Sequence, residues 1–199
     1  MTRSPTSRQL GFAAWLARLA ANEDRGTLAA LRRGLMLDEE HLFELYGCVP
    51  PSFLVGLSLG DERLYLMVAA LFGYHPVCFR EEELKERRCN LGASLRMLAL
   101  ARAQRHSPDA GEGDDTEDLL PDSMKRRMEA LLASHRDDLF GHLRQVIGLL
   151  KTEEVPVDWA QLLNDLQAWE WQGRPVQWQW SRSFYVGHHE KGGDENNVS

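Results

Sequence analysis

The sequence predicts an all-α protein made of two packed, bundle-like helical subdomains with no significant β-sheet. Apolar residues recur at spacings of three and four through most of the chain, which is the period of amphipathic helices. Alternating strands, hairpin turns and internal repeats are not evident in the pattern. The 199 residues, 43% of them hydrophobic, are enough to form a substantial core.

The predicted N-terminal subdomain spans residues 1–89 and contains four helical segments. Asp24 or Thr27 can cap the second segment, and an acidic first turn at residues 38–40 opens the third. The length and the alanines of the fourth favour a buried helix over a strand. The apolar positions of the four segments fall within Phe12–Leu19, Leu28–Leu35, Leu42–Tyr46 and Arg63–Tyr74.

The predicted C-terminal subdomain spans residues 90–187. Its first helix is apolar on most sides and is expected to be central. Residues 107–122 are rich in Pro, Gly and Asp and predict a mobile acidic loop, and residues 188–199 have the composition of a disordered tail. The helical patterns cover 90–105, 124–135, 139–150, 159–169 and 176–185.

The net charge of −7 is unevenly distributed along the chain. Seven acids and no Lys or Arg lie between residues 106 and 122, and the tail after Gly187 adds three acids and one lysine. The rest of the chain therefore carries a small excess of basic residues. Local density of this kind matters more for phosphate binding than net charge does. An ordinary solvated helical surface explains the same composition equally well.

No catalytic or metal-binding signature is found in the sequence. It contains no HExxH, no Walker A glycine loop and no GxSxG, and its three cysteines form no CxxC. The adjacent pair His188–His189 lies in the predicted tail, where no rigid frame could hold a metal. We therefore expect no enzymatic activity, no metal and no cofactor. With no long apolar run and no signal peptide, we expect a cytoplasmic protein that does not contact membranes.

The basic residues carry the strongest functional signal. Arg144 and Lys151, seven positions apart, would project from the same flank of one helix. Residues 125–127, Lys-Arg-Arg, are expected to crowd the first turn of the preceding helix, where cations oppose the helix dipole and an external anion would stabilise them. Arg32 and Arg33 near the end of their helix are less diagnostic, because the dipole favours them there. These residues predict a phosphate-binding surface, with intramolecular salt bridges as the alternative.

The six tryptophans are expected to be mainly structural. Trp15, Trp159 and Trp169 occur at core spacing on helical patterns. The less regular Trp171, Trp178 and Trp180 could stack on bases, as aromatic residues do in single-strand channels, but a C-terminal packing plug is the preferred interpretation.

The order of these segments resembles the CasB family, the small subunit of the type I-E CRISPR Cascade complex. The resemblance covers most of residues 10–186, and it depends on order and spacing because each motif alone is weak. The acidic segment 107–122 and the tail match nothing in it. The matching pieces are Leu28–Arg33, Asn90-Leu91-Gly92, Met124–Lys151, Pro156-Val157-Asp158-Trp159, Leu162–Trp169 and Phe184-Tyr185.

The resemblance implies a non-catalytic α-helical subunit, present as a head-to-tail pair beside the backbone and large subunits of a crRNA-guided complex. Its basic face would stabilise the hybrid of crRNA and target DNA and the displaced strand of the R-loop, in antiviral defence. The implied phosphate contacts are Arg32, Arg33, Arg126, Arg127 and Arg144. A second tier, chosen only because its members lie in matching segments, is Arg96, Arg102, Lys151 and Arg182.

Two other functions fit the sequence less well. A helical adaptor that binds only protein would use the charged face for docking and would not retain nucleic acid. A helix-turn-helix regulator would need a polar recognition helix after a tight turn, whereas the candidate helices are mostly apolar.

Overall fold

The computed structural model describes residues 4–36, 44–86, 89–106 and 120–187. Within these residues the chain is helical and contains no strand, apart from an isolated parallel bridge between Cys78 and Val157, so the all-α prediction is confirmed. The helices are α1 (Ser7–Ala21), α2 (Arg25–Arg33), α4 (Leu59–Tyr74), α5 (Glu81–Glu86), α6 (Leu91–His106), α7 (Asp122–Ala133), α8 (Arg136–Thr152), α9 (Trp159–Gln167) and α10 (Pro175–Tyr185), with short 3-10 turns at Gly34–Met36 and Pro51–Phe53.

Local capping chemistry sets where several helices begin. Thr6 and Gln9 form a reciprocal capping box at the start of α1. Asp24 accepts a hydrogen bond from the backbone N–H of Thr27 and so caps α2, as one of the two predicted caps. Ser58 caps α4 and Asp158 caps α9 in the same way.

Three predicted features lie largely outside the described residues. The third helical segment, opened by residues 38–40, falls mostly within 37–43, and residues 107–119 and 188–199 hold most of the acidic loop and all of the tail. At the end of the predicted loop, Asp122 is the first residue of α7. The predicted division into subdomains at residue 89 stays a prediction.

Helix α4 forms the centre of the core on one side of the molecule. Every residue from Leu64 to Gly73 is buried, so this helix is covered all round. It packs against α2, α8 and α9. At the crossing with α2, a Cβ added to Gly73 would lie 2.7 Å from the backbone nitrogen of Arg32, so the two helices can approach this closely only at a glycine.

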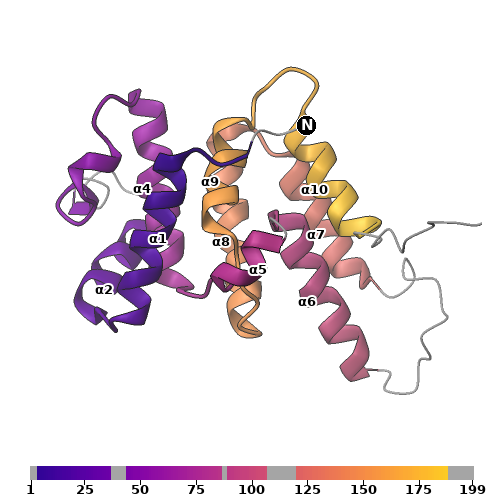
Figure 1. Cartoon of the computed structure of the whole chain (residues 1–199). Helices are drawn as coiled ribbons and strands as arrows, with labels where there is room; N and C mark the ends of the chain where they lie inside the picture. Colours follow the sequence, from indigo (N-terminus) through magenta and orange to yellow (C-terminus); the bar gives the residue numbers. More distant parts are fainter. Residues whose placement is uncertain (1–3, 37–43, 87–88, 107–119, 188–199) are drawn as a thin grey trace, which may run out of the picture.

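Helices α8 and α9 lie between two groups of helices (Figure 1). On one side are α1, α2 and α4; on the other are α6, α7 and α10. Helix α9 packs on α1 and α4, and α10 packs chiefly on α6. Trp159 on α9 contacts Phe72 of α4 with ring centroids 5.4 Å apart, which joins the two halves of the sequence in one continuous core.

Candidate nucleic-acid interface

Two adjoining hollows lie along α8 and bring together three of the predicted arginines. The larger, of about 500 Å³, is bounded by α4, α8 and α7, and the smaller, of about 150 Å³, lies between α7 and α8. Arg127 and Gln145 line both hollows, so we treat them as one feature, the arginine groove. Its lining residues are Tyr74, Arg126, Arg127, Ala130, Gly141, His142, Arg144, Gln145, Val146, Gly148 and Leu149.

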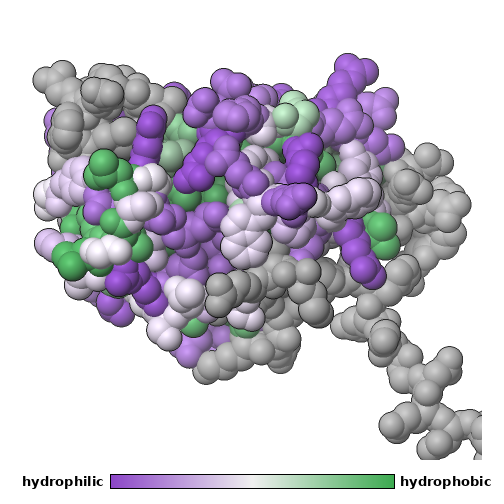
Figure 2. Space-filling model, turned by 90° about the horizontal axis from the view of Figure 1, so that it is seen from above, coloured by the Kyte–Doolittle hydropathy of each residue, from purple (hydrophilic) through white to green (hydrophobic). Residues whose placement is uncertain are grey.

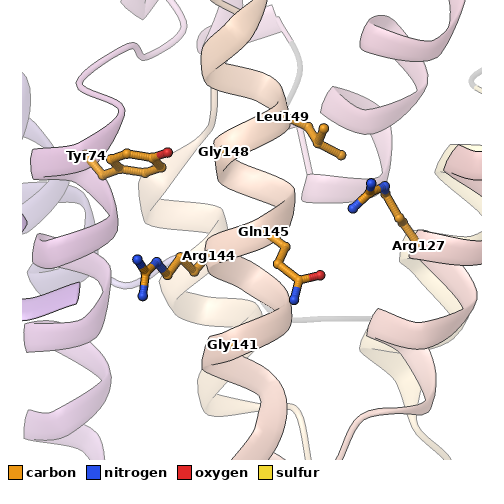
Figure 3. A pocket seen from close by; sticks show the side chains of 7 residues that line it. All are labelled: Tyr74, Arg127, Gly141, Arg144, Gln145, Gly148 and Leu149. Atoms are coloured by element: carbon orange, nitrogen blue, oxygen red, sulfur yellow. The ribbon is translucent and has the colours of Figure 1, made fainter. Parts of the chain in front are cut away.

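The arginines reach the groove because the apolar faces of α7 and α8 are turned inward. Helix α7 buries Met124, Met128 and Leu131, which leaves Arg126 and Arg127 exposed. On α8 the buried stripe likewise leaves Arg144 exposed. Figure 3 shows Arg127 extending from α7 toward α8, and Arg144 on the side of α8 that faces Tyr74.

Two of the residues at the bottom of the groove are glycines, which have no side chain to fill it. Gly141 and Gly148 are two turns apart on α8 and flank Arg144 and Gln145 (Figure 3). A Cβ added at Gly141 would meet no atom within 4 Å. The helix backbone is therefore accessible at Gly141, where a ligand can approach it closely. At Gly148 an added Cβ would lie 3.5 Å from the Tyr74 hydroxyl oxygen, so that side chain lies against the second glycine.

The groove is electropositive and holds no acidic residue among its described lining residues. None of the ion pairs between described residues involves Arg126, Arg127 or Arg144. Arg144 donates one hydrogen bond, of 3.2 Å, to the carbonyl oxygen of Leu35, which fixes its guanidinium and leaves further N–H donors. Lys151 lies close by, with Nζ 4.0 Å from the centre of the Tyr74 ring.

Two arginines of the second tier are bound within the fold. Arg96 Nη1 donates to the carbonyl oxygens of Phe184 and Tyr185, at 2.8 and 3.0 Å, and so binds the last turn of α10. Arg102 contacts the Thr152 hydroxyl at 3.1 Å and the Glu153 carboxylate at 3.6 Å. These two residues were chosen only because they lie in matching segments, and the sequence did not reveal their internal partners.

The other predicted basic residues are not among those that line the groove. Arg32 and Arg33 are exposed on α2, and Arg33 pairs with Glu44 at 3.3 Å. Arg182 is exposed on α10. The structure therefore brings Arg126, Arg127 and Arg144 together at the groove, with Lys151 beside it, while Arg32, Arg33 and Arg182 do not line it.

The argument from the dipole of α7 needs correction. Because α7 begins at Asp122, residues 125–127 lie in its second turn, and the first turn carries an acid, Asp122. The dipole penalty falls off within the first turn, so it does not call for an external anion here. The acid-free lining of the groove is a better argument for anion binding than the helix end was.

Sequence reasoning missed the neutral residues of the groove. Tyr74 comes from α4, far from α8 in sequence, and only the tertiary fold brings it there. The spacing of Gly141 and Gly148 on an otherwise amphipathic pattern was a usable signal for an open helix face. Gln145 and His142, beside the arginine stripe, had no comparable signal.

The tryptophans divide between core and surface. Trp159, Trp169 and Trp180 are buried, with Trp180 fully inaccessible. Trp171 and Trp178 are 46% and 74% exposed, so the predicted C-terminal plug is wrong for these two. The spacing along α10 explains the difference, because Trp178 lies on the helix face opposite to Val176, Trp180 and Phe184.

Two other kinds of feature are absent from the described residues. Within the described parts of the chain, no helix combines the length and the apolar character that a bilayer crossing requires. No cluster of three or more His, Cys, Asp and Glu side chains is arranged to hold a metal ion among those residues.

The fold and the groove together define an all-α protein whose surface carries a groove lined by arginines, with two glycines of α8 at its bottom. The sequence matches the CRISPR-associated protein Cse2 family over residues 27–185, and the chain belongs to this family. A Cse2 protein of Thermus thermophilus is 28% identical over 176 residues, covering 87% of this chain and 88% of its own length.

Solved structures agree with this assignment. CasB of M. ruber superposes with a TM-score of 0.66 and 27% identity, covering 91% of this chain and 94% of that one. A chain of a CRISPR RNA-guided surveillance complex superposes with a TM-score of 0.65 and 25% identity, covering 90% and 92%. The resemblance to the CasB family is thereby confirmed.

Proposed function

We propose that this chain is the non-catalytic small subunit of a crRNA-guided surveillance (Cascade) complex. In this role it binds nucleic-acid backbone through its basic surface and stabilises both the crRNA–target hybrid and the displaced strand of the R-loop. Family membership and the likeness to a chain of an RNA-guided surveillance complex support the assembly part of the proposal. The acid-free arginine groove is the observation that supports direct nucleic-acid contact.

The groove chemistry suits phosphate rather than bases. Arginine binds phosphate with two parallel N–H donors, and exposed Arg126, Arg127 and Arg144 offer such donors over a low helical floor. Among the described lining residues, Tyr74 is the one Phe, Tyr or Trp, and its ring already lies under Lys151. Sequence specificity would then come from base pairing with the guide, and the protein would supply backbone contacts.

The proposal keeps the predicted partners and residues. Partners are crRNA and target DNA, the backbone and large subunits, and a second copy arranged head to tail, all in the cytoplasm. Arg32 and Arg33 remain proposed phosphate contacts outside the groove, and Lys151 and Arg182 remain in the second tier. Arg96 and Arg102 have internal partners, and we expect them to contribute mainly to packing.

One observation favours an adaptor role as the second candidate. Val55 and Leu59 are 69% and 80% exposed, and Figure 2 shows apolar residues gathered toward the end of the molecule formed by α1, α2 and α4. Such residues suit a protein contact. An adaptor would associate with partner subunits and retain no nucleic acid.

A salt titration separates the two candidates. The full chain is mixed with labelled single- and double-stranded DNA and RNA, and the affinity is measured as salt increases. Phosphate contacts predict sequence-independent binding that falls steeply with salt. No binding at low salt would contradict direct nucleic-acid contact and favour the adaptor.

Paired charge reversals locate the contact. Arg126→Glu with Arg127→Glu should weaken binding more than about tenfold, with unchanged helicity, because two cations in the groove become acids. Arg25→Glu with Arg63→Glu is the matched control, since both residues are exposed, outside the groove, and change the net charge equally. Equal losses from the two pairs would show that only net charge matters.

A further inference from the structure

Helix α10 carries an exposed tryptophan that neither the core nor the arginine groove explains. Trp178 is 74% exposed, whereas Trp180 on the same helix is fully buried and donates to Asp165 at 2.7 Å. Leaving so large an aromatic surface in water gives up burial energy that most tryptophans gain. Figure 1 shows α10 at the far end of the molecule from α1 and α2.

Basic residues lie on both sides of this tryptophan along the chain. Arg174 precedes Trp178 by four positions and Arg182 follows it by four, and all three are exposed. Trp178 and Arg182 share one face of α10, about 6 Å from each other along the axis, whereas Arg174 is the residue before the helix, with a left-handed backbone (φ 51°). Arg174 also donates to the carbonyl oxygen of Leu132, which holds it against α7.

The surrounding sequence is free of acids. No Asp or Glu occurs between residues 171 and 187, and Glu170, just before this stretch, is 3.2 Å from Arg136. A second exposed indole, Trp171, lies at the turn before α10, where its carbonyl accepts from the Arg174 N–H at 3.0 Å. Burial raises the pKa of Tyr185 at the end of α10, and the carboxylate of Glu129 on α7 raises it further. The face is thus aromatic and cationic, which suits a polyanion with accessible rings.

We propose that Arg174, Trp178 and Arg182 form a binding site for single-stranded nucleic acid, in which a base stacks on Trp178 and the phosphates on its two sides meet the arginines. The alternation of cation, aromatic and cation matches the order of phosphate, base and phosphate along one strand. A duplex does not fit, because its bases are already stacked and cannot lie on a surface indole. This inference extends the proposed function to a second site, which recognises unpaired bases rather than backbone alone.

The test compares three substitutions at Trp178 in the full chain. Labelled oligo(dT) and a blunt-ended DNA duplex of equal charge are the probes. Trp178→Ala and Trp178→Leu should weaken oligo(dT) binding about 5- to 100-fold, the range for loss of one stacked base, and leave duplex binding unchanged. Trp178→Tyr retains a ring and should retain most of the affinity.

Each alternative gives a different result. If Trp178→Leu binds oligo(dT) like the wild type, the contact is apolar rather than stacking and the proposal fails. Unchanged oligo(dT) binding with lost retention of partner subunits would make the face a protein contact, and the proposal also fails. Wild-type binding that is lost only through groove substitutions would overturn this inference and leave the proposed function standing. No binding of either probe by the wild type would overturn both.

Discussion

Helices α6 and α8 have similar lengths, and each contains a glycine followed by an arginine, yet the glycine and the arginine have different roles in the two helices. Each carries a glycine in its first two turns and an arginine after it. In α6, a Cβ on Gly92 would lie 2.2 Å from the carbonyl oxygen of Trp180, and Arg96 donates to the end of α10. In α8, Gly141 faces open space and Arg144 is exposed in the groove.

The comparison shows that the role of the glycine and the arginine depends on whether another helix packs over their face, and not on residue type. The α6 pair holds two helices together, and the α8 pair leaves a helix face open to a ligand. The predictions below test this contrast at the glycines, in the core beside α10, and at the arginines.

Gly92→Ala should give the largest change in stability. The added methyl group collides with the backbone of α10, which cannot move without disturbing the core around Trp180. We expect the free energy of unfolding to fall by about 3 kcal/mol, as measured by urea denaturation. A loss below about 0.5 kcal/mol would mean that α6 and α10 are not packed this closely.

The packing beside α10 should also make stability depend on pH. Burial raises the pKa of Asp165 to about 7, although hydrogen bonds from Trp180 and Gln161 act to lower it. The pKa of the unfolded carboxyl is about 4. Between pH 4 and pH 7 the Asp165 carboxyl is therefore protonated in the folded state and ionised in the unfolded state. The free energy of unfolding falls as pH rises from about 4 to 7, because the unfolded state releases this proton first. Above pH 7 this loss is complete.

Asp165→Asn tests this dependence. Its amide can accept from Trp180 and donate to Gln161 if the Gln161 amide is flipped. Relative to the variant, the wild type should lose at least ~1 kcal/mol between pH 5 and pH 8, the equivalent of one pKa unit. Parallel pH profiles for the two proteins would contradict the raised pKa.

Gly141→Ala should have a smaller effect of the opposite sign to Gly92→Ala. The added methyl group meets nothing within 4 Å, and alanine favours the helix. We expect a gain of about 0.5–1 kcal/mol in the same denaturation experiment. A loss would mean that the floor of the groove is not open.

Much of the fold was predictable from the sequence because its signals are local. Apolar spacing predicted α1 and α7 to α10, the length and the alanines of Arg63–Tyr74 predicted α4, and Asp24 was among the predicted caps. The helix start at Asp122 was missed, although the preceding proline and the acid are recognised start signals.

The candidate site was predictable only in part. The arginines of α7 and α8 were found from their spacing, but Tyr74 joins them through a tertiary contact. The internal partners of Arg96 also lie far away in sequence, on α10. Spacing shows which side chains share a face of one helix, and only the packing of helices shows whether another element covers that face.

The most direct test compares the salt dependence of nucleic-acid binding for Arg144→Gln and Arg96→Gln. Each substitution removes one positive charge from a middle position of its helix. Arg144→Gln should make the slope of log affinity against log salt shallower by about 0.7–0.9, the value of one phosphate contact. Its cost in stability should be about 1 kcal/mol, because the Leu35 carbonyl loses one donor. Arg96→Gln should leave the slope unchanged and lower the free energy of unfolding by about 2 kcal/mol, because carbonyls of α10 lose their donor. Equal slopes for the two variants would contradict the claim that the groove on α8, and not the packed face of α6, binds the nucleic-acid backbone.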